Sequence, residues 1–434
     1  MNIVVSGTGY VGLITAVCLA EMGNKVTCVD VNKEKINLLK SGKAPILENG
    51  LEELMQKNKG RLIYTSNVEI AYKEADIIFI AVGTPERKDG SVNLKYVYEV
   101  VNDVVKNIQK DVIVVIKSTV PIGTNKKIEN IINKNIKTNI KVEVVSNPEF
   151  LSQGTAIRDT LNAKRIVLGV NSESAKNKMK ELYKNMNIPI IITNRESAEM
   201  IKYASNDFLA LKLSYINEIA NLCEKVGANI EDVTRGMGFD DRIGDKFINA
   251  GIGYGGSCFP KDTKALNWCA NLYDYDLKTI KSAIEVNINQ KIRLIKKARK
   301  YYESFNNCNV AILGLTFKPN TDDLREAPSL DNIPILLEDG ANIKAFDPVG
   351  EKVYKNIKYE NITYCNSIEE TISNADICFI FTEWDCIKNI DIQLFEKLMR
   401  NPIILDGRNC FKIEKIKKYN VIYESIGREI IKNV

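Results

Sequence analysis

The chain has 434 residues, 45% of them hydrophobic and 26% charged, which is typical of a folded globular protein. Its net charge of +5 is spread along the sequence, so a nucleic acid is not an expected partner. Histidine is absent, which excludes Ser-His-Asp and Cys-His nucleophile sites and leaves proton transfer to Lys, Asp, Glu, Tyr, Cys or water.

The cysteines predict a reducing compartment. There are ten, with no C-x-x-C pair and no closely spaced disulfide framework, so we expect a cytoplasmic protein without a metal site. Residues 3–20 are apolar, but no positive charge precedes them and glycines interrupt them, which argues against a signal peptide. No other stretch is apolar enough to predict a membrane span.

The first elements are a strand at residues 3–5, a glycine motif at 7–12, a helix at 13–22 and a strand at 25–29. Gly7, Gly9 and Gly12 form the pattern G-x-G-x-x-G, which allows a tight turn and the approach of a pyrophosphate to the helix N-terminus. Asp30 ends the second strand and would bind the ribose hydroxyls while repelling a 2′-phosphate. The motif therefore predicts NAD, and the alternative is a glycine-rich turn in an unrelated α/β domain.

The alternation continues with strands expected at 75–82, 112–116 and 141–145, and with a helix at 94–108. Thr84, Ser118, Thr119 and Glu149 follow these strands. Ligands of parallel sheets bind beyond the carboxyl ends of the strands, so these side chains are candidate site residues. The alternative for each hydroxyl is a helix cap.

From residue 197 the pattern becomes helical, with long helices expected at 197–226 and 276–302. Lys202 and Asn206 share a face of the first helix, either as part of a site or simply facing solvent. Between the helices, residues 249–264 hold four glycines before Cys258, and Pro260 predicts a helix start there. A helix N-terminus favours a thiolate, and Asp262 would share a face with Cys258. The alternative is a surface loop with a buried, inert cysteine.

A third region repeats the first pattern, with strands expected at 308–313, 341–346, 375–381 and 402–405. Residues 375–380 echo residues 75–80, so the chain contains two similar α/β halves around a helical connector. The second half lacks G-x-G-x-x-G and should bind something other than a dinucleotide pyrophosphate in that mode.

Together these motifs resemble the UDP-glucose/GDP-mannose dehydrogenase family along essentially the whole chain. The matching stretches are residues 7–12, 118–124, 147–151, 202–206, 255–262, 317–323 and 406–408. The resemblance implies two Rossmann-like, doubly wound α/β domains joined by a mostly helical central domain with a long connecting helix. We expect an NAD-binding domain at 1–196, a central dimerisation and catalytic domain at 197–303, and a UDP-sugar-binding domain at 304–434.

The resemblance also implies an activity, the NAD-dependent oxidation of UDP-glucose to UDP-glucuronate with release of two NADH. Cys258 would hold the sugar carbon as a thiohemiacetal and then as a thioester. Lys202 and Asn206 would stabilise the oxyanion, and Asp262 would handle the water or proton of hydrolysis. Thr119 and Glu149 would position water and assist proton transfer.

Binding residues are carried over from the same resemblance. The expected NAD contacts are Gly7, Gly9, Tyr10, Val11, Gly12, Asp30, Lys35, Thr84, Ser118, Thr119, Gln153 and Arg325. The expected substrate contacts are Glu149, Phe150, Leu151, Lys202, Asn206, Asn249, Gly253, Tyr254, Gly255, Phe317, Lys318 and Arg408, with Arg242 reaching the sugar from the second subunit of a homodimer. Any one of these cations could instead be a surface charge.

One position departs from the family pattern, since Gln153 stands where the family usually has Glu. A neutral amide can bind but cannot act as a base, so Gln153 is assigned to binding. The run Pro148-Glu149-Phe150-Leu151 favours UDP-glucose. The alternatives are a dehydrogenase of GDP-mannose or UDP-N-acetylmannosamine, a non-catalytic sugar-nucleotide binding protein, and a one-step NAD oxidoreductase.

Overall fold

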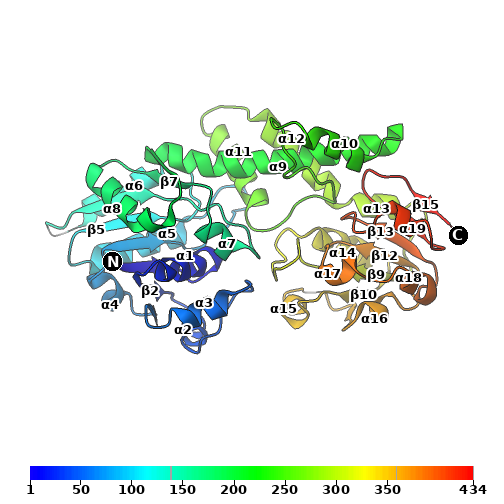
Figure 1. The fold of residues 1–434 in the computed structure, drawn as a ribbon, viewed down its shortest axis with the longest axis horizontal. Coiled ribbons are helices and arrows are strands. Elements are labelled where there is room, and N and C mark those ends of the chain that lie inside the picture. The colour runs from blue at the N-terminus through cyan, green and yellow to red at the C-terminus, as the bar shows by residue number, and fades with distance from the viewer. Residues whose placement is uncertain (137–138, 358, 434) are drawn as a thin grey trace. The chain divides into compact units, whose positions relative to one another are not determined.

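The computed structural model describes residues 1–136, 139–357 and 359–433. The chain divides into two compact units, Met1–Ser205 with Trp268–Tyr275 and Asn206–Asn267 with Asp276–Val434. Each unit contains a mostly parallel sheet with helices, and the segments between the sheets are helical, which confirms the predicted fold class (Figure 1). The three-domain division at residues 196/197 and 303/304 stays a prediction.

The sheet of the first unit has eight strands among the described residues, in the order β3-β2-β1-β4-β5-β6-β7-β8. Neighbours are parallel except β6 and β7, which meet at Ser146 and Gly169. The strands are β1 (Asn2–Ser6), β2 (Lys25–Val29), β3 (Leu62–Thr65), β4 (Ile77–Ile80), β5 (Val112–Ile116), β6 (Val142–Ser146), β7 (Ile166–Gly169) and β8 (Ile190–Thr193). The chain reverses direction across the sheet between β1 and β4, which is where a doubly wound fold places its ligand.

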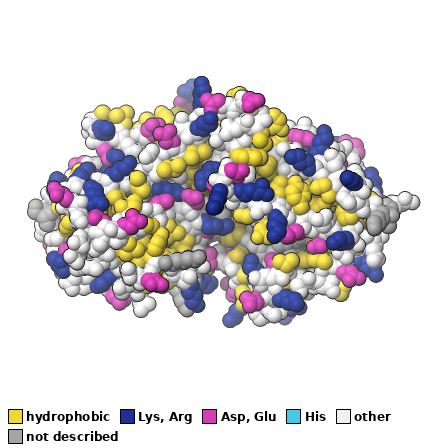
Figure 2. Space-filling model, turned by 180° about the vertical axis from the view of Figure 1, so that it is seen from behind, with side chains coloured by type: hydrophobic (Ala, Val, Ile, Leu, Met, Phe, Trp, Pro, Cys, Tyr) yellow, Lys and Arg dark blue, Asp and Glu magenta, His cyan; other side chains and the backbone are white. Residues whose placement is uncertain are grey.

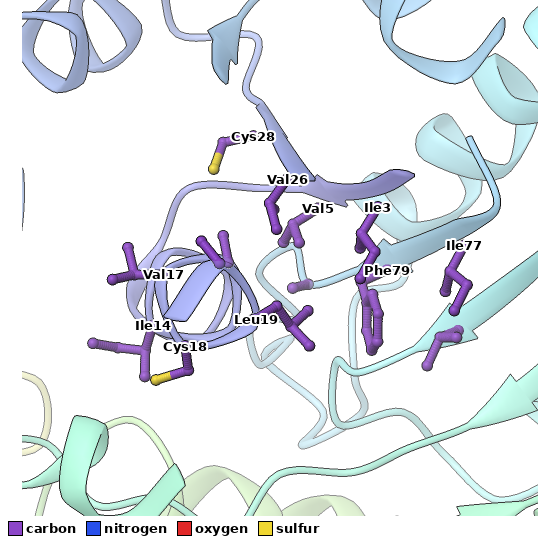
Figure 3. Packing of buried hydrophobic residues seen from close by; sticks show 14 of the residues in the cluster. Ile3, Val5, Ile14, Val17, Cys18, Leu19, Val26, Cys28, Ile77 and Phe79 are labelled. Atoms are coloured by element: carbon purple, nitrogen blue, oxygen red, sulfur yellow. The ribbon is translucent and has the colours of Figure 1, made fainter. Parts of the chain in front are cut away.

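The helices of this unit are α1 (Tyr10–Glu21), α2 (Lys33–Lys40), α3 (Leu51–Lys57), α4 (Val68–Lys73), α5 (Lys95–Asn107), α6 (Thr124–Asn135), α7 (Ala156–Leu161) and α8 (Glu173–Tyr183), with a 3₁₀ turn at Lys184–Met186. Strands such as β4 are apolar throughout because helices cover both faces of the sheet. Figure 3 shows Leu19 of α1 on the side of the helix that faces Val5 and Phe79. This packing fixes α1, and with it the glycine motif at its start.

The helical segments are α9 (Arg195–Val226), α10 (Ile230–Gly238), α11 (Phe259–Asn271), α12 (Lys278–Lys291) and α13 (Arg293–Ala298). The single helix predicted at 276–302 is wrong, because it is broken at Ile292. The Lys291 carbonyl accepts a hydrogen bond from Asn332 Nδ2 at 2.8 Å, and this side chain interrupts the helical ladder. Within the described residues, no helix combines the length and the apolar character needed to cross a membrane.

The second unit holds a seven-stranded sheet within its described residues, in the order β11-β10-β9-β12-β13-β14-β15, with only the last pair antiparallel. Its strands are β9 (Asn309–Leu313), β10 (Asn342–Phe346), β11 (Ile362–Tyr364), β12 (Ile377–Ile380), β13 (Ile403–Asp406), β14 (Ile422–Glu424) and β15 (Ile431–Lys432). Its helices are α14 (Pro328–Glu338), α15 (Glu351–Tyr354), α16 (Ile368–Ile372), α17 (Asp385–Lys388), α18 (Gln393–Leu398) and α19 (Ile413–Ile416). On the face shown in Figure 2, basic and acidic side chains are interspersed, as a thinly spread charge predicts.

Candidate active site

The glycine motif between β1 and α1 has the shape that a dinucleotide pyrophosphate requires. Gly7 has φ +99°, and a Cβ there would lie 2.7 Å from the Ala81 carbonyl oxygen. A Cβ on Gly12 would collide with the Gly7 carbonyl oxygen, whereas one on Gly9 would meet no described heavy atom within 4 Å. The first and third glycines are therefore required by packing, and Gly9 leaves the approach to the N-terminus of α1 open. These residues fit NAD.

Asp30 lies at the end of β2 beside this loop. Its Oδ2 accepts hydrogen bonds from Thr8 N at 2.8 Å and Thr8 Oγ1 at 2.6 Å, and its Oδ1 accepts from Asn32 N at 2.9 Å. Burial alone would raise the pKa of Asp30, but these hydrogen bonds and the charge of Lys35 hold the pKa below its ordinary value. Asp30 is therefore an anion at neutral pH, which suits a ribose and opposes a 2′-phosphate.

Tyr10 and Val11 open α1 and Lys35 lies in α2, whereas Thr84, Ser118, Thr119 and Gln153 follow β4, β5 and β6, at the expected edge of the sheet. Thr84 and Ser118 are buried, and Thr119 is half-buried. Ser118 Oγ donates to the Val82 carbonyl at 2.7 Å, so this hydroxyl also connects the two loops. Gln153 lies in a turn closed by a hydrogen bond from Thr155 N to Ser152 O at 3.1 Å.

A buried charged cluster follows β6. Lys202 Nζ donates to Glu149 Oε1 at 2.8 Å, and Glu149 Oε2 accepts from Leu151 N at 2.8 Å. Both side chains are buried, so the solvent-facing alternative for Lys202 is wrong. Burial would raise the pKa of Glu149, but the charge and hydrogen bond of Lys202, the hydrogen bond from Leu151 N and the charge of Lys117 together hold the pKa below its ordinary value. The Phe150 ring lies against the cluster, 5.6 Å from Lys202 Nζ.

Lys117 is a member of this cluster that the sequence analysis did not assign. It follows β5, and its Nζ donates to the Asn147 carbonyl at 3.3 Å. Burial lowers the pKa of Lys117 to about 8, although the charge of Glu149 opposes the shift. Its place directly before Ser118, at the carboxyl end of a strand, was the available signal.

In the second unit, α9 and α11 position a second cluster. Asn206 Nδ2 donates to Asp262 Oδ2 at 2.7 Å, and Lys261 Nζ pairs with Asp262 Oδ1. Asn206 and Asp262 are both buried, so the solvent-facing alternative is wrong for Asn206 as well. The two donors hold the Asp262 carboxyl group in one orientation, which a group that exchanges a proton with a substrate requires.

Cys258 lies directly before α11, as predicted. Asp262 N donates to the Cys258 carbonyl at 2.8 Å, which closes the first helical turn. Cys258 is partly exposed, so the buried, inert alternative is wrong. The dipole of α11 favours a thiolate at this position, and the Arg325 guanidinium lies close enough to interact with the sulfur electrostatically.

Asp207 is a second residue that the sequence analysis missed. It is buried, and within the described residues neither carboxyl oxygen has a hydrogen-bond partner. Burial and the charge of Asp262 raise the pKa of Asp207 to about 8. It therefore stays a neutral acid at pH 7, and only its position beside Asn206 hinted at such a role.

The glycine-rich loop before Cys258 is held by side chains rather than by regular structure. Asn287 accepts from Tyr254 N at 2.8 Å, and a Cβ on Gly253 would lie 2.7 Å from the same oxygen. Arg408 donates to the carbonyls of Gly253 at 3.0 Å and Phe317 at 3.1 Å. Three residues predicted to bind the sugar nucleotide thus lie together in the second unit. Gly255 is also buried there, whereas Asn249 is exposed.

The other predicted cations have different surroundings. Arg325 forms a fork with Asp323, with Nε–Oδ1 and Nη2–Oδ2 distances of 2.8 and 2.6 Å. Lys318 Nζ lies 5.6 Å from the Phe317 ring centroid. Arg242 is exposed and pairs with Asp240 at 2.6 Å. The roles given to all these residues stay predictions.

No group of three or more Cys, Asp or Glu side chains in the described part of the chain could hold a metal ion. Within the second unit, the thiol at the start of α11 and the carboxyl group of Asp262 one turn further on suit nucleophilic addition to a carbonyl carbon followed by hydrolysis.

Comparison with known proteins gives the same family as the motifs. Models of the UDP-glucose/GDP-mannose dehydrogenase family match residues 1–187 (NAD binding domain), 196–289 (central domain) and 311–413 (UDP binding domain). UDP-glucose 6-dehydrogenase YwqF of Bacillus subtilis is 47% identical, with 99% of this chain and 98% of that protein covered.

Solved structures agree. A UDP-glucose dehydrogenase from Pyrobaculum islandicum superposes with a TM-score of 0.92 at 33% identity, covering 98% of both chains. A UDP-D-ManNAc dehydrogenase from Pyrococcus horikoshii gives a TM-score of 0.87 at 27% identity, covering 100% of both. With three family domains matched in order on a chain that carries the glycine motif and the thiol at the start of α11, the protein belongs to the UDP-glucose/GDP-mannose dehydrogenase family.

Proposed function

We propose that the protein oxidises the C6 alcohol of UDP-glucose to a carboxylate, with two NAD⁺ reduced per sugar. The observation that carries this proposal is the partly exposed thiol of Cys258 at the start of α11, one turn from a carboxylate held by Asn206 and Lys261. Such a pair suits a covalent intermediate that is later hydrolysed. The relatives named UDP-glucose 6-dehydrogenase support the choice of sugar.

Bound NAD⁺ would accept the hydrides. The chain would supply the nucleophile and the proton transfers, and the resemblance gives Thr119 and Glu149 the role of passing the proton of the alcohol to water. The Cys258 thiolate would add to the C6 aldehyde, and stabilisation of the resulting oxyanion is the role that the family resemblance gives to Lys202 and Asn206. After the second oxidation the carbon is a thioester. Asp262 takes a proton from the attacking water, the C–S bond breaks, and the thiolate returns. The balance is one alcohol, two NAD⁺ and one water giving one carboxylate, two NADH and three protons.

The test is a stoichiometric assay of the purified protein with UDP-glucose and NAD⁺. We expect two NADH per sugar and UDP-glucuronate as the product by mass. Cys258→Ala should reduce acid formation on the order of a thousandfold or more, because the covalent route is lost. One NADH per sugar, or full acid production by Cys258→Ala, would contradict the thioester route.

A second candidate is the oxidation of another nucleotide sugar, such as UDP-N-acetylmannosamine. The observation in its favour is the likeness over the full chain to a UDP-D-ManNAc dehydrogenase. A panel of UDP-glucose, UDP-N-acetylmannosamine and GDP-mannose at equal concentrations separates the two candidates. The highest kcat/KM identifies the substrate.

We also propose a homodimer through α9. Phe208, Tyr215 and Leu222 are exposed and lie seven residues apart, which places three large apolar side chains on one helix face. An exposed apolar stripe of this kind on a helix suits pairing with its copy. Arg242 would then reach the second subunit's substrate. Light scattering should give twice the chain mass of 48.8 kDa, and Tyr215→Lys should lower it.

The proposed location is the cytoplasm. All ten cysteines are thiols rather than disulfides, which suits a reducing compartment. Acid trapping of cells followed by thiol titration should find ten thiols per chain. A count that is lower by two or a multiple of two would indicate disulfides and place the protein in an oxidising compartment instead.

A further inference from the structure

Glu48 is a buried carboxylate in the loop between α2 and α3 that neither the motifs nor the proposed mechanism uses. Its surroundings come from two distant segments of the first unit. Oε2 accepts from Tyr10 Oη and, at 2.7 Å, from Gly154 N. Oε1 accepts from Ile157 N at 3.3 Å. Gly154 N also donates to Tyr10 Oη at 2.8 Å, so the three groups form a closed set.

Each end of this set belongs to the predicted dinucleotide site. Tyr10 is the first residue of α1, directly after Gly9, where the pyrophosphate is expected. Gly154 follows Gln153, a predicted cofactor contact, and has φ +84°, a conformation that favours glycine. The turn around Gly154 is held from its other side by Asp159, which accepts from Ser152 N at 3.1 Å and Thr155 Oγ1 at 2.7 Å.

The geometry points to Glu48 as a positioning residue that holds the start of α1 and the Gln153 turn in the arrangement that binds NAD. We name this set the Tyr10–Glu48–Gly154 bracket. Hydrogen bonds to an ionised acceptor are about twice as strong as neutral ones, so a carboxylate suits the role better than an amide. Pre-ordering two segments before the ligand arrives removes part of the ordering cost of binding. The inference rests on the proposed NAD-dependent function.

The test compares Glu48→Ala, Glu48→Gln and Tyr10→Phe with a matched control, Glu52→Ala. Glu52 lies four residues further along and accepts one backbone hydrogen bond, from Ala44 N at 2.9 Å, but it is exposed. For each protein the measurements are the Kd of NAD⁺ by calorimetry, KM for NAD⁺ and for UDP-glucose, and the thermal midpoint.

We expect Glu48→Ala to raise the Kd and KM of NAD⁺ at least tenfold, with KM for UDP-glucose within twofold of wild type. Glu48→Gln and Tyr10→Phe should each raise the Kd about threefold, since each keeps part of the bracket. The double variant Tyr10→Phe with Glu48→Ala should bind NAD⁺ no more weakly than Glu48→Ala alone, because the two residues act as one unit. Glu52→Ala should match wild type.

An NAD⁺ Kd within twofold of wild type in Glu48→Ala, or an equal rise in both KM values, would overturn the inference and leave a structural role only. Should Glu48→Ala fail to fold, the same criterion applies to Glu48→Gln and Tyr10→Phe. A wild-type protein that binds NAD⁺ but does not oxidise UDP-glucose would reject the proposed function, while the calorimetric series would still decide on the bracket.

Discussion

The two sheets share one arrangement after their first strand, but the acid that follows the second strand has different surroundings in each sheet. Gly7 N donates to the Val29 carbonyl at 2.7 Å, and Gly314 N donates to the Phe346 carbonyl at 2.8 Å. In each case an acid ends the second strand, Asp30 in the first sheet and Asp347 in the second. The repeat extends to the acids before β4 and β12, whose carboxylates accept from Asn2 N and Asn309 N at 2.9 and 2.8 Å.

The difference lies in what surrounds the acid at the end of the second strand. Asp30 is half-buried, and the hydrogen bonds it receives lower its pKa. Asp347 is 1% exposed and accepts from Leu315 N at 2.8 Å and from Trp384 Nε1 at 3.3 Å. Burial raises the pKa of Asp347 despite these bonds. The same position in the two sheets thus holds a half-buried acid, which we predict to bind the ribose, and a fully buried acid that serves the protein interior.

The largest expected effect comes from removing the internal acid. Asp347→Ala should lower the free energy of unfolding of the second unit by about 3–5 kcal/mol, because several buried N–H donors lose their acceptor. A Trp268→Phe background leaves Trp384 as the reporter in urea unfolding, since the chain has two tryptophans. The affinity for NAD⁺ should stay within twofold of wild type, and a tenfold loss would contradict a purely internal role of Asp347.

Two glycines, one from each loop, should fail in different ways when substituted. A Cβ on Gly314, at φ +82°, would lie 2.5 Å from Thr382 Cβ, so Gly314→Ala should destabilise the second unit by about 2–3 kcal/mol. Gly9→Ala should fold normally but lose on the order of a hundredfold in NAD⁺ affinity, because its Cβ occupies the pyrophosphate approach. Calorimetry and urea unfolding of both variants check this. Normal NAD⁺ binding by Gly9→Ala would contradict the open-loop interpretation.

Removing the half-buried acid, Asp30, should affect binding more than stability. Asp30→Ala should weaken NAD⁺ binding 10- to 100-fold, about 1.4–2.7 kcal/mol, through the lost charge-assisted bonds to ribose. Its unfolding midpoint should change less than that of Asp347→Ala. The matched control is Asp76→Asn, which alters an acid of the same sheet at its opposite edge. A stability loss without an affinity loss would make Asp30 structural.

The smallest effect is a difference in pH dependence between the two acids. Because the pKa of Asp30 is lowered in the folded state, its stabilising contribution is present above the ordinary value of 3.8 and is lost as the pH falls through the folded pKa. The pKa of Asp347 is raised, so stability falls as the pH rises from 3.8 towards the folded pKa. The free energy of unfolding should be measured with urea at pH 3–6. Asp30→Asn should no longer lose stability as the pH falls, and Asp347→Asn should no longer lose stability as the pH rises. Parallel curves would refute the contrast.

Short sequence motifs predicted most of the strands and helices, because these elements depend mainly on residues that are close in the sequence. The glycine motif, Asp30 and the echo between residues 75–80 and 375–380 all lie within single βα units, and the structure places them as expected. The break at Ile292 was not predictable, because Asn332 causes it from forty residues away. The hydrogen bond from Trp384 to Asp347 could not be predicted for the same reason, because the two residues are far apart in the sequence.

The candidate site shows the same limit. The position of Cys258 before a helix followed from Pro260 and the preceding glycines. The burial of Lys202 and Asn206 could not be predicted from the sequence. A polar pair at positions i and i+4 has the same sequence pattern whether it faces solvent or a buried partner such as Glu149. Glu48 carried no signal at all, since its partners Tyr10 and Gly154 lie far away in the chain.

The position of Cys258 has a consequence for covalent labelling. Burial raises the pKa of Cys18 and Cys28 to about 12 and that of Cys410 well above its ordinary range. Even the exposed Cys386 has a raised pKa. At neutral pH, a brief pulse of an alkylating reagent should therefore modify Cys258 before the other cysteines. A covalent inhibitor could then inactivate the protein by reacting at this one residue.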